Sequence, residues 1–192
     1  MLNSHNRGDW VTDRERVLSA QRGGREAMAS LYNTYRLQAY QTALVVLQDP
    51  HLADDVVQEA FIRAFREIGR CDPDRPFAPW IARIVINLPR NALRSRRFLP
   101  LPARDRHGTL EPRYAASEAR VDLWPVLQRL TRAHREVLLL RYFHGFTEPE
   151  IAEILGLPVG TVKSRLHAAR QAVRRHLNAA DEMSGKEMTP DG

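Results

Sequence analysis

The chain has 192 residues, a net charge of +6, a pI of about 10.1 and a mean hydropathy of −0.44. These values indicate a soluble protein of one large or two small domains. The sequence excludes a membrane span, a signal peptide and an intramolecular disulfide, because no apolar run is long enough and Cys71 is the single cysteine. It contains neither CxxC nor HExxH, so we expect no metal and no cofactor.

The first clear helical pattern follows an N-terminal extension and lead-in, residues 1–26. Side chains recur at helical spacing at three positions: Leu31, Tyr35 and Ala39. The following QAYQTALVVL continues this pattern as a mostly buried helix. The Asp49-Pro50 pair should end it, since the residue before a proline disfavours the helical conformation.

The segment DDVVQEAFIRAFREIG predicts a second, amphipathic helix. Its apolar face consists of Val57, Phe61, Ala64, Phe65 and Ile68. Gly69 is expected to be the C-cap, because glycine readily adopts the left-handed conformation that is common there. The turn-rich loop CDPDRPF separates this helix from the next one.

A third helix begins near Pro79 and carries four apolar side chains on one side: Trp80, Ile81, Ile84 and Leu88. Pro89 lies about ten residues into this helix, where a proline removes the hydrogen bond to the carbonyl of Val85. Because the apolar face continues past Pro89, we expect a kink between Val85 and Pro89 and not a break.

Residues 99–119 contain three prolines, one glycine and balanced charges, without apolar periodicity. This composition predicts a flexible linker. Helical patterns occupy the chain on both sides of it, and no alternation is long enough for a strand. The predicted fold class is therefore all-α, with two small helical domains at 27–98 and 120–178, followed by a disordered acidic tail, 179–192.

The second domain ends in a helix-turn-helix pattern. Thr147 and Glu150 have the spacing of a capping box, and Pro149 falls in the first turn, where its missing N–H costs little. The turn GLPVG then leads to a basic helix with an inward stripe formed by Val162, Leu166, Ala169, Val173 and Leu177. In this motif the second helix enters the DNA major groove, and its N-terminal residues contact base edges.

Cations are concentrated in two segments that contain no acid, one from Arg83 to Arg97 and the other from Gly160 to Asn178. An exposed helix normally mixes both signs, because opposite charges at i,i+4 stabilise it. A solvated face would explain one such segment. Two of them favour a protein that binds the phosphate backbone of nucleic acid.

Two stretches resemble a known family. REVLLLRYFHGFTEPEIAEILGLPVGTVKSRLHAARQAV is similar to the −35-binding domain, region 4, of bacterial extracytoplasmic function (ECF) sigma factors. LADDVVQEAFIRAF followed by PWIARIVINLPRNALRSRR resembles region 2 of the same family. The resemblance covers most of the chain, from about Ala27 to Phe98 and from about Asp122 to Leu177. The two regions are joined by a linker and not by a region 3 domain, an organisation that resembles the ECF group.

The resemblance implies a promoter-specificity subunit without catalysis of its own, located in the cytoplasm and not inserted in a membrane. Its partners would be core RNA polymerase, through the β′ coiled coil and the β flap, double- and single-stranded promoter DNA, and an anti-sigma factor. The family pattern also assigns roles to individual positions. The residues implied to bind core polymerase are Asp54, Asp55, Gln58 and Glu59.

The loop 69–77 matches the segment that captures a flipped base of the −10 element, and the helix after it matches the part that melts and holds this strand. The implied −10 residues are Arg75, Phe77, Trp80, Arg83, Asn87, Arg90, Asn91 and Arg94. The implied −35 residues are Thr161, Lys163, Ser164, Arg165, His167 and Arg170. The chain departs from the family at Asn91, where many members carry Asp, and at Ala168, where many carry Arg.

Two other functions fit part of the pattern. An autonomous helix-turn-helix regulator would have to dimerise on a two-fold operator, and no coiled-coil heptads are present for this purpose. A serine recombinase would need an α/β N-terminal domain with a nucleophilic serine. The sequence contains neither a phosphate-cradling glycine loop nor paired catalytic carboxylates, so we expect that the protein is not an enzyme.

Overall fold

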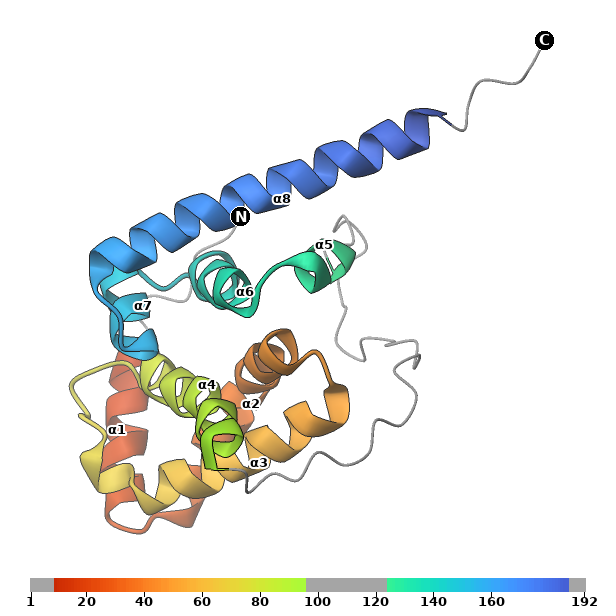
Figure 1. Cartoon of the computed structure of the whole chain (residues 1–192). Helices are drawn as coiled ribbons and strands as arrows, with labels where there is room; N and C mark the ends of the chain where they lie inside the picture. The colour runs from red at the N-terminus through yellow and green to blue at the C-terminus, as the bar shows by residue number, and fades with distance from the viewer. Residues whose placement is uncertain (1–8, 96–123, 187–192) are drawn as a thin grey trace.

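The computed structural model describes residues 9–95 and 124–186, with side chains placed for 13–89 and 125–177. The N-terminal unit comprises α1 (Asp9–Gln21), α2 (Arg25–Leu47), α3 (Pro50–Arg66), the 3₁₀ turn η1 (Ile68–Arg70) and α4 (Phe77–Ser95). The C-terminal unit comprises α5 (Trp124–Arg129), α6 (Arg132–Leu138), the π-helical turn η2 (Leu139–Phe143), α7 (Glu148–Leu155) and α8 (Val159–Lys186). All regular elements in the described ranges are helical, which confirms the all-α prediction (Figure 1).

Helix α1 lies within the segment that was expected to be an N-terminal extension. It buries Val17 and Ala20 together with the charged Asp13, so its apolar stripe is short and interrupted. A tight turn connects it to α2. Gly23 has a φ of +86°, and a Cβ on Gly24 would lie 2.9 Å from the Ser19 carbonyl oxygen, so this turn requires glycine at both positions.

Helix α3 begins with the features that its sequence predicts. The Asp49 carboxylate accepts hydrogen bonds from the backbone N–H groups of His51 and Leu52, and Pro50 occupies the first turn. Its end differs from the prediction that Gly69 is the C-cap. The helix stops at Arg66, and Gly69 lies inside η1, a tighter turn that needs no left-handed residue.

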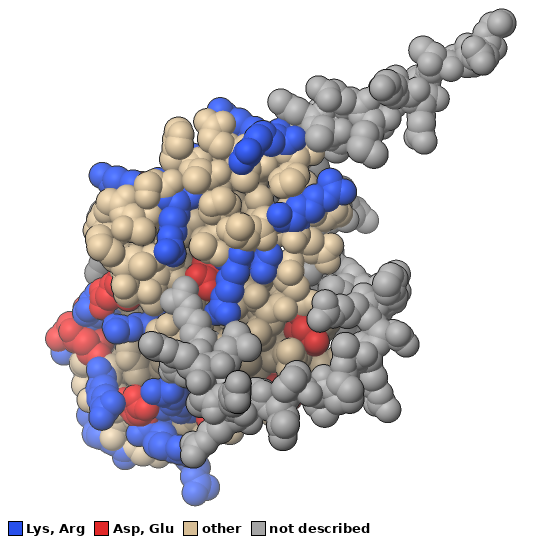
Figure 2. Space-filling model, in the orientation of Figure 1, with Lys and Arg blue, Asp and Glu red and all other residues tan. Residues whose placement is uncertain are grey.

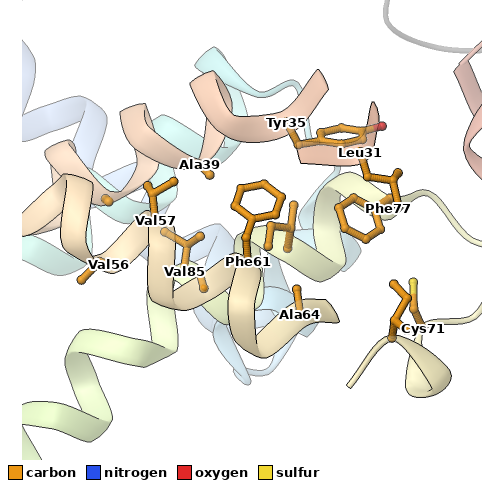
Figure 3. Close-up of a cluster of buried hydrophobic side chains, with 14 of the residues drawn as sticks. Leu31, Tyr35, Ala39, Val56, Val57, Phe61, Ala64, Cys71, Phe77 and Val85 are labelled. Atoms are coloured by element: carbon orange, nitrogen blue, oxygen red, sulfur yellow. The ribbon is translucent and has the colours of Figure 1, made fainter. Parts of the chain in front are cut away.

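The core of the N-terminal unit is built from the helical faces predicted for α2, α3 and α4. Phe77 is fully buried, and its ring centroid lies 5.2 Å from that of Tyr35 and 5.5 Å from that of Trp80. Figure 3 shows Phe61, Phe77 and Tyr35 lying between the helices, with Cys71 beside them at the loop. Truncating a buried phenylalanine of this kind typically costs about 3–5 kcal/mol.

The helix-turn-helix is present as predicted. Thr147 and Glu150 form both hydrogen bonds of a capping box at the start of α7. Gly156 then adopts the left-handed conformation with a φ of +67°, which lets the chain turn into α8. The predicted inward stripe of α8 is buried at Val162, Leu166 and Ala169. The helix continues to Lys186, so residues 179–186 are helical where a disordered tail was expected.

The two predicted helical domains are present as two units, and they pack directly against each other, a contact that the sequence did not predict. Residues 99–119 lie outside the described residues. In Figure 1, α6 and α7 lie beside α2 and α4. Ile86 and Ala82 of α4 and Val46 of α2 are buried in one hydrophobic cluster with side chains of the C-terminal unit. The units therefore share a core in addition to having their own. No helix within the described residues is long and apolar enough to cross a membrane.

Candidate nucleic-acid interface

Helix α8 presents its polar side chains away from the buried stripe. Lys163, Ser164, His167 and Arg170 are exposed, and Thr161 and Arg165 are partly exposed. The Ser164 hydroxyl donates to the Thr161 carbonyl oxygen at 3.0 Å, which leaves its oxygen able to accept a further hydrogen bond. All six side chains predicted for −35 recognition thus lie on one helix, at or near its surface.

The charge around α8 has one dominant sign. Among the described side chains, the ion pair that α8 makes joins Lys163 Nζ to Glu148 Oε2 at 3.9 Å. In Figure 2 the part of the molecule that contains α8 and α6 shows Lys and Arg, while the Asp and Glu residues of this face lie lower, toward the N-terminal unit. This arrangement suits a negatively charged polymer along α8.

The side chains predicted for the −10 element are in several different environments. Phe77 is buried in the core, Trp80 and Asn87 are partly buried, and Arg83 is exposed. Arg90, Asn91 and Arg94 lie in α4, but only their backbone is described. Helix α4 continues through Pro89 to Ser95, so the helix does not break at the proline; the predicted kink stays a prediction.

The loop between α3 and α4 has a defined conformation. The Asp72 carboxylate accepts a hydrogen bond from the Asp74 backbone N–H at 2.9 Å, and the Arg75 N–H bonds to the Asp72 carbonyl at 3.2 Å. The Cys71 side chain is buried, and burial together with the nearby Asp72 raises the pKa of its thiol to about 11. A thiol with this pKa is protonated at neutral pH and therefore unreactive.

Arg75 makes a bidentate ion pair with Glu153 of α7. Its Nη1 lies 2.9 Å from Glu153 Oε1, and its Nη2 bonds to Oε2. The hydrogen bonds from Arg75 lower the pKa of the Glu153 carboxyl, and the charge of Arg83 adds to this effect. One cation of the loop predicted to contact the −10 element is therefore already neutralised by an acid of the helix-turn-helix.

Two further polar contacts join the units. The buried Arg135 of α6 donates from Nε to the Val45 carbonyl oxygen at 2.9 Å, near the C-terminal end of α2, where a cation is favoured. The Thr42 hydroxyl lies 2.9 Å from His144 Nε2. Burial lowers the pKa of His144 to about 4, so the imidazole is neutral in this contact at physiological pH.

The face of α3 predicted to bind polymerase is open to solvent. Asp54, Asp55, Gln58 and Glu59 are all exposed. Three exposed apolar residues were not among the predicted contacts. Ile62, next to this face, is 53% exposed, and Tyr142 and Phe143 on η2 are 54% and 50% exposed. Large apolar side chains at the surface mark sites of protein contact when they lie together.

The interdomain residues Arg135 and His144 were also not predicted. Their partners lie 90 and 102 residues away in the sequence, and no local pattern identifies contacts of this range. The described residues contain no group of three or more His, Cys, Asp or Glu side chains that could hold a metal ion.

Comparison with known proteins agrees with this division of the chain. The family "Sigma-70 region 2" matches residues 31–98, and the family "Sigma-70, region 4" matches residues 120–173. The ECF RNA polymerase sigma factor SigW of Bacillus subtilis is 30% identical over 179 residues, covering 85% of this chain and 96% of that protein. The ECF RNA polymerase sigma factor SigL of Mycobacterium tuberculosis is 34% identical over 167 residues, covering 83% of this chain and 93% of that protein.

The fold is similar to that of solved sigma factors. The structure of CnrH in complex with the cytosolic domain of CnrY superposes with a TM-score of 0.64 at 30% sequence identity, covering 87% of this chain and 97% of that one. CnrH is an RNA polymerase sigma factor of Cupriavidus metallidurans. The N-terminal unit thus corresponds to region 2 and the C-terminal unit to region 4, and the chain belongs to the ECF sigma factors, the promoter-specificity subunits of RNA polymerase.

Proposed function

We propose that this sigma subunit divides promoter recognition between three surfaces: α8 reads the −35 duplex, α4 with the loop before it captures the −10 strand, and the exposed face of α3 binds core polymerase. The observation that carries this proposal is the presence of two basic segments without acids, residues 160–178 of the recognition helix and a second segment that begins on α4 at Arg83. The protein performs this role without catalysis and in the cytoplasm.

On α8, side-chain chemistry distinguishes base contacts from phosphate contacts. Ser164 and His167 are exposed near the N-terminal half of the helix and can bond to base edges in the major groove. Lys163, Arg165 and Arg170 lie beside them and suit phosphate oxygens. Thr161, in the first turn, is placed to bond a phosphate with its hydroxyl.

In the −10 surface, Trp80 supplies an aromatic ring for stacking, and Arg75 and Arg83 supply cations for the strand backbone. Asn87, Arg90, Asn91 and Arg94 continue this surface along α4. Phe77 is buried, so it supports Trp80 from the core and does not touch DNA.

On α3, the acids Asp54, Asp55 and Glu59 with Gln58 provide charge for a basic partner surface, and the exposed Ile62 provides apolar area at the same site. This combination suits the β′ coiled coil of core polymerase. On the C-terminal unit, Tyr142 and Phe143 provide an apolar contact for the β flap.

The two units must separate before both promoter elements can be bound. Elements centred 25 base pairs apart lie about 85 Å apart along B-DNA, at 3.4 Å per base pair. The described arrangement holds Arg75 of the −10 surface in a hydrogen-bonded ion pair with α7 of the helix-turn-helix. It is therefore the form of the protein without a promoter.

An anti-sigma factor is a further proposed partner. CnrH has been solved with the cytosolic domain of CnrY, and RpoE of Bartonella quintana with the anti-sigma factor NepR. The latter is 20% identical to this chain and supports the shared fold alone. We call the described arrangement, in which the two units are packed together, the closed form. A protein that binds the closed form would inhibit transcription, because the units could not separate to bind both promoter elements.

The test is transcription by the full-length protein with core RNA polymerase on a randomised promoter library. We expect joint protection of the −35 and −10 regions that requires polymerase. Arg165→Ala should weaken −35 binding and reduce the slope of log K against log salt by about one, whereas Arg129→Ala, an exposed cation on α5, should not. Tight DNA protection by the free protein, unchanged by polymerase, would instead identify an autonomous regulator.

A further inference from the structure

Helix α1 contacts the loop that connects α3 and α4, although it precedes residue 31, where the match to region 2 begins. One of these contacts is made by Gln21, the last residue of α1. Its side-chain Nε2 donates to the carbonyl oxygen of Ile68 at 3.1 Å and to that of Cys71 at 2.8 Å. Both partners are backbone atoms at the two ends of the η1 turn.

The primary amide of Gln21 suits this position because it carries two N–H groups, one for each carbonyl. The Ile68 carbonyl already accepts the Cys71 N–H at 3.0 Å, which closes the 3₁₀ turn. The Gln21 amide also bonds to the carbonyl of Cys71, the residue that follows η1, so one side chain holds the start and the exit of the turn. The direction in which the chain leaves η1 is thereby set by a side chain 50 residues earlier.

Other residues on the same helix hold the rest of the loop. Arg14 Nε lies 2.8 Å from Asp74 Oδ1 in an exposed ion pair. The buried Asp13 carboxylate accepts a hydrogen bond from the Tyr35 hydroxyl, and the Tyr35 ring packs against Phe77 at the end of the loop. Helix α1 therefore contacts the loop at its start and middle and, through Tyr35, at its end.

The position of α1 is itself restricted. Gly23 has a φ of +86°, and a Cβ on Gly24 would lie 2.9 Å from the Ser19 carbonyl oxygen. The Gly24 N–H donates to that same oxygen at 2.9 Å. Because this turn admits little variation, the Gln21 amide is presented to the loop from one direction.

We propose that Gln21 is a positioning residue for −10 recognition: by bonding the carbonyls of Ile68 and Cys71, it fixes the loop in the conformation that receives the −10 strand. The proposal rests on the proposed function, in which loop 69–77 and Trp80 contact that strand. Gln21 does not touch DNA; it acts through the exposed Gly69, Arg70 and Arg75, whose backbone it orients.

The test compares four variants of the full-length protein, each reconstituted with core RNA polymerase on a promoter library randomised in the −10 element. Gln21→Leu keeps the size and removes both donors. Gln21→Glu is nearly isosteric and turns a carboxylate toward two carbonyl oxygens. Gln21→Lys keeps a donor group of similar reach. Gln41→Leu, the same change on a partly exposed glutamine of α2, is the matched control.

We expect base preference in the −10 element to weaken by about threefold to tenfold in Gln21→Leu, the range that one or two lost hydrogen bonds produce. Gln21→Glu should lose more, Gln21→Lys should retain most of the preference, and Gln41→Leu should match the wild type. Binding of the −35 duplex should be equal in all of them. Amide exchange in the η1 turn should become faster in Gln21→Leu and Gln21→Glu, in the same order as the loss of preference.

A structural effect alone would lower the melting temperature and the total amount of open complex without changing which −10 sequences are selected. That result in Gln21→Leu would overturn the proposal, as would a Gln21→Glu variant that selects like the wild type. Trp80→Ala distinguishes the −10 role of this surface from the positioning role of Gln21. If it leaves −10 selection unchanged, the proposed function of this surface fails together with the role of Gln21. If Trp80→Ala alters selection and Gln21→Leu does not, only the positioning role fails.

Discussion

The recognition helix α8 and helix α4 are both proposed to contact promoter DNA, but the structure leaves them in different states. On α8, Lys163, His167 and Arg170 are exposed and the buried stripe faces its own unit. On α4, Ala82 and Ile86 are covered by the C-terminal unit, and Arg75 in the preceding loop is paired with Glu153. One DNA surface is thus ready to bind, while the other is partly occupied by the chain itself.

This difference indicates that the contact between the units controls the −10 surface more than the −35 surface. The contact combines an apolar part around Ile86, a polar contact between Thr42 and His144, and the exposed Arg75–Glu153 pair. These parts differ in burial, so they should differ in strength. Removing them one at a time tests whether α4 is the surface that closure restricts.

The largest effect is expected from Ile86→Asp. Ile86 is fully buried in the cluster shared by the two units, and an uncompensated buried charge costs about 3–5 kcal/mol. In the open form the new carboxylate reaches water, so the units should separate while each remains folded. Dyes attached through Arg66→Cys and Gln171→Cys, both exposed positions, should report a longer distance by energy transfer.

The control for this experiment is Ile62→Asp, which places the same charge on an apolar residue that is 53% exposed. It should leave the distance between the dyes unchanged. A short distance in Ile86→Asp with both units folded would show that the apolar cluster does not hold them together.

An intermediate effect is expected from pH through His144. Burial lowers its pKa to about 4 from the ordinary 6.5, and Thr42 of the other unit lies 2.9 Å from its ring. We therefore expect the closed form to bind a proton less readily than the open form. The contact is therefore at full strength above pH 6.5 and weakens as the pH falls from 6.5 toward 4. Between about pH 7.5 and 5.5 the loss should be roughly 1 kcal/mol.

The same dye pair measures this transition. His144→Gln keeps a side chain that can bond the Thr42 hydroxyl and does not titrate, so its distance should change less over this pH range. Equal pH dependence in the two proteins would assign the transition to other groups. The exposed His167 has no part in the contact between the units and provides a further control as His167→Gln.

Local features of the fold could be predicted from the sequence because their causes are local. The capping box at Thr147 and Glu150 and the buried stripe of α8 depend on residues within one or two turns of each other. The cap at Gly69 was predicted wrongly. Burial of Ile68 and the hydrogen bond from the Cys71 N–H to its carbonyl hold Gly69 in a 3₁₀ turn, where it does not need a positive φ.

The contacts between distant segments could not be predicted. Gln21 bonds to a carbonyl 50 residues away, and Thr42 contacts a ring 102 residues away. A glutamine at a helix end or a histidine after an apolar run has many possible partners, and a single sequence does not distinguish them. The residues on each DNA-binding helix could therefore be proposed from the sequence. That the C-terminal unit covers part of α4 became apparent only from the structure.

The smallest effect is expected from Glu153→Gln, which keeps the shape of the side chain and removes its charge. The Arg75 and Glu153 side chains are 56% and 48% exposed, and an exposed ion pair contributes about 0–1 kcal/mol. Closure should weaken only slightly, but Arg75 and Arg83 lose the acid that neutralises them. The affinity of the free protein for a single-stranded −10 oligonucleotide should therefore rise by about twofold to fivefold.

Glu148→Gln is the matched control, because Glu148 lies on the same helix and pairs with Lys163 of α8 at 3.9 Å. It changes the net charge equally, so it should leave binding of the −10 strand unchanged and raise binding of the −35 duplex instead. Equal gains for the −10 strand in both variants would mean that general charge is responsible. A gain for the −10 strand confined to Glu153→Gln would show that Glu153 itself competes with DNA for the −10 surface, through its ion pair with Arg75.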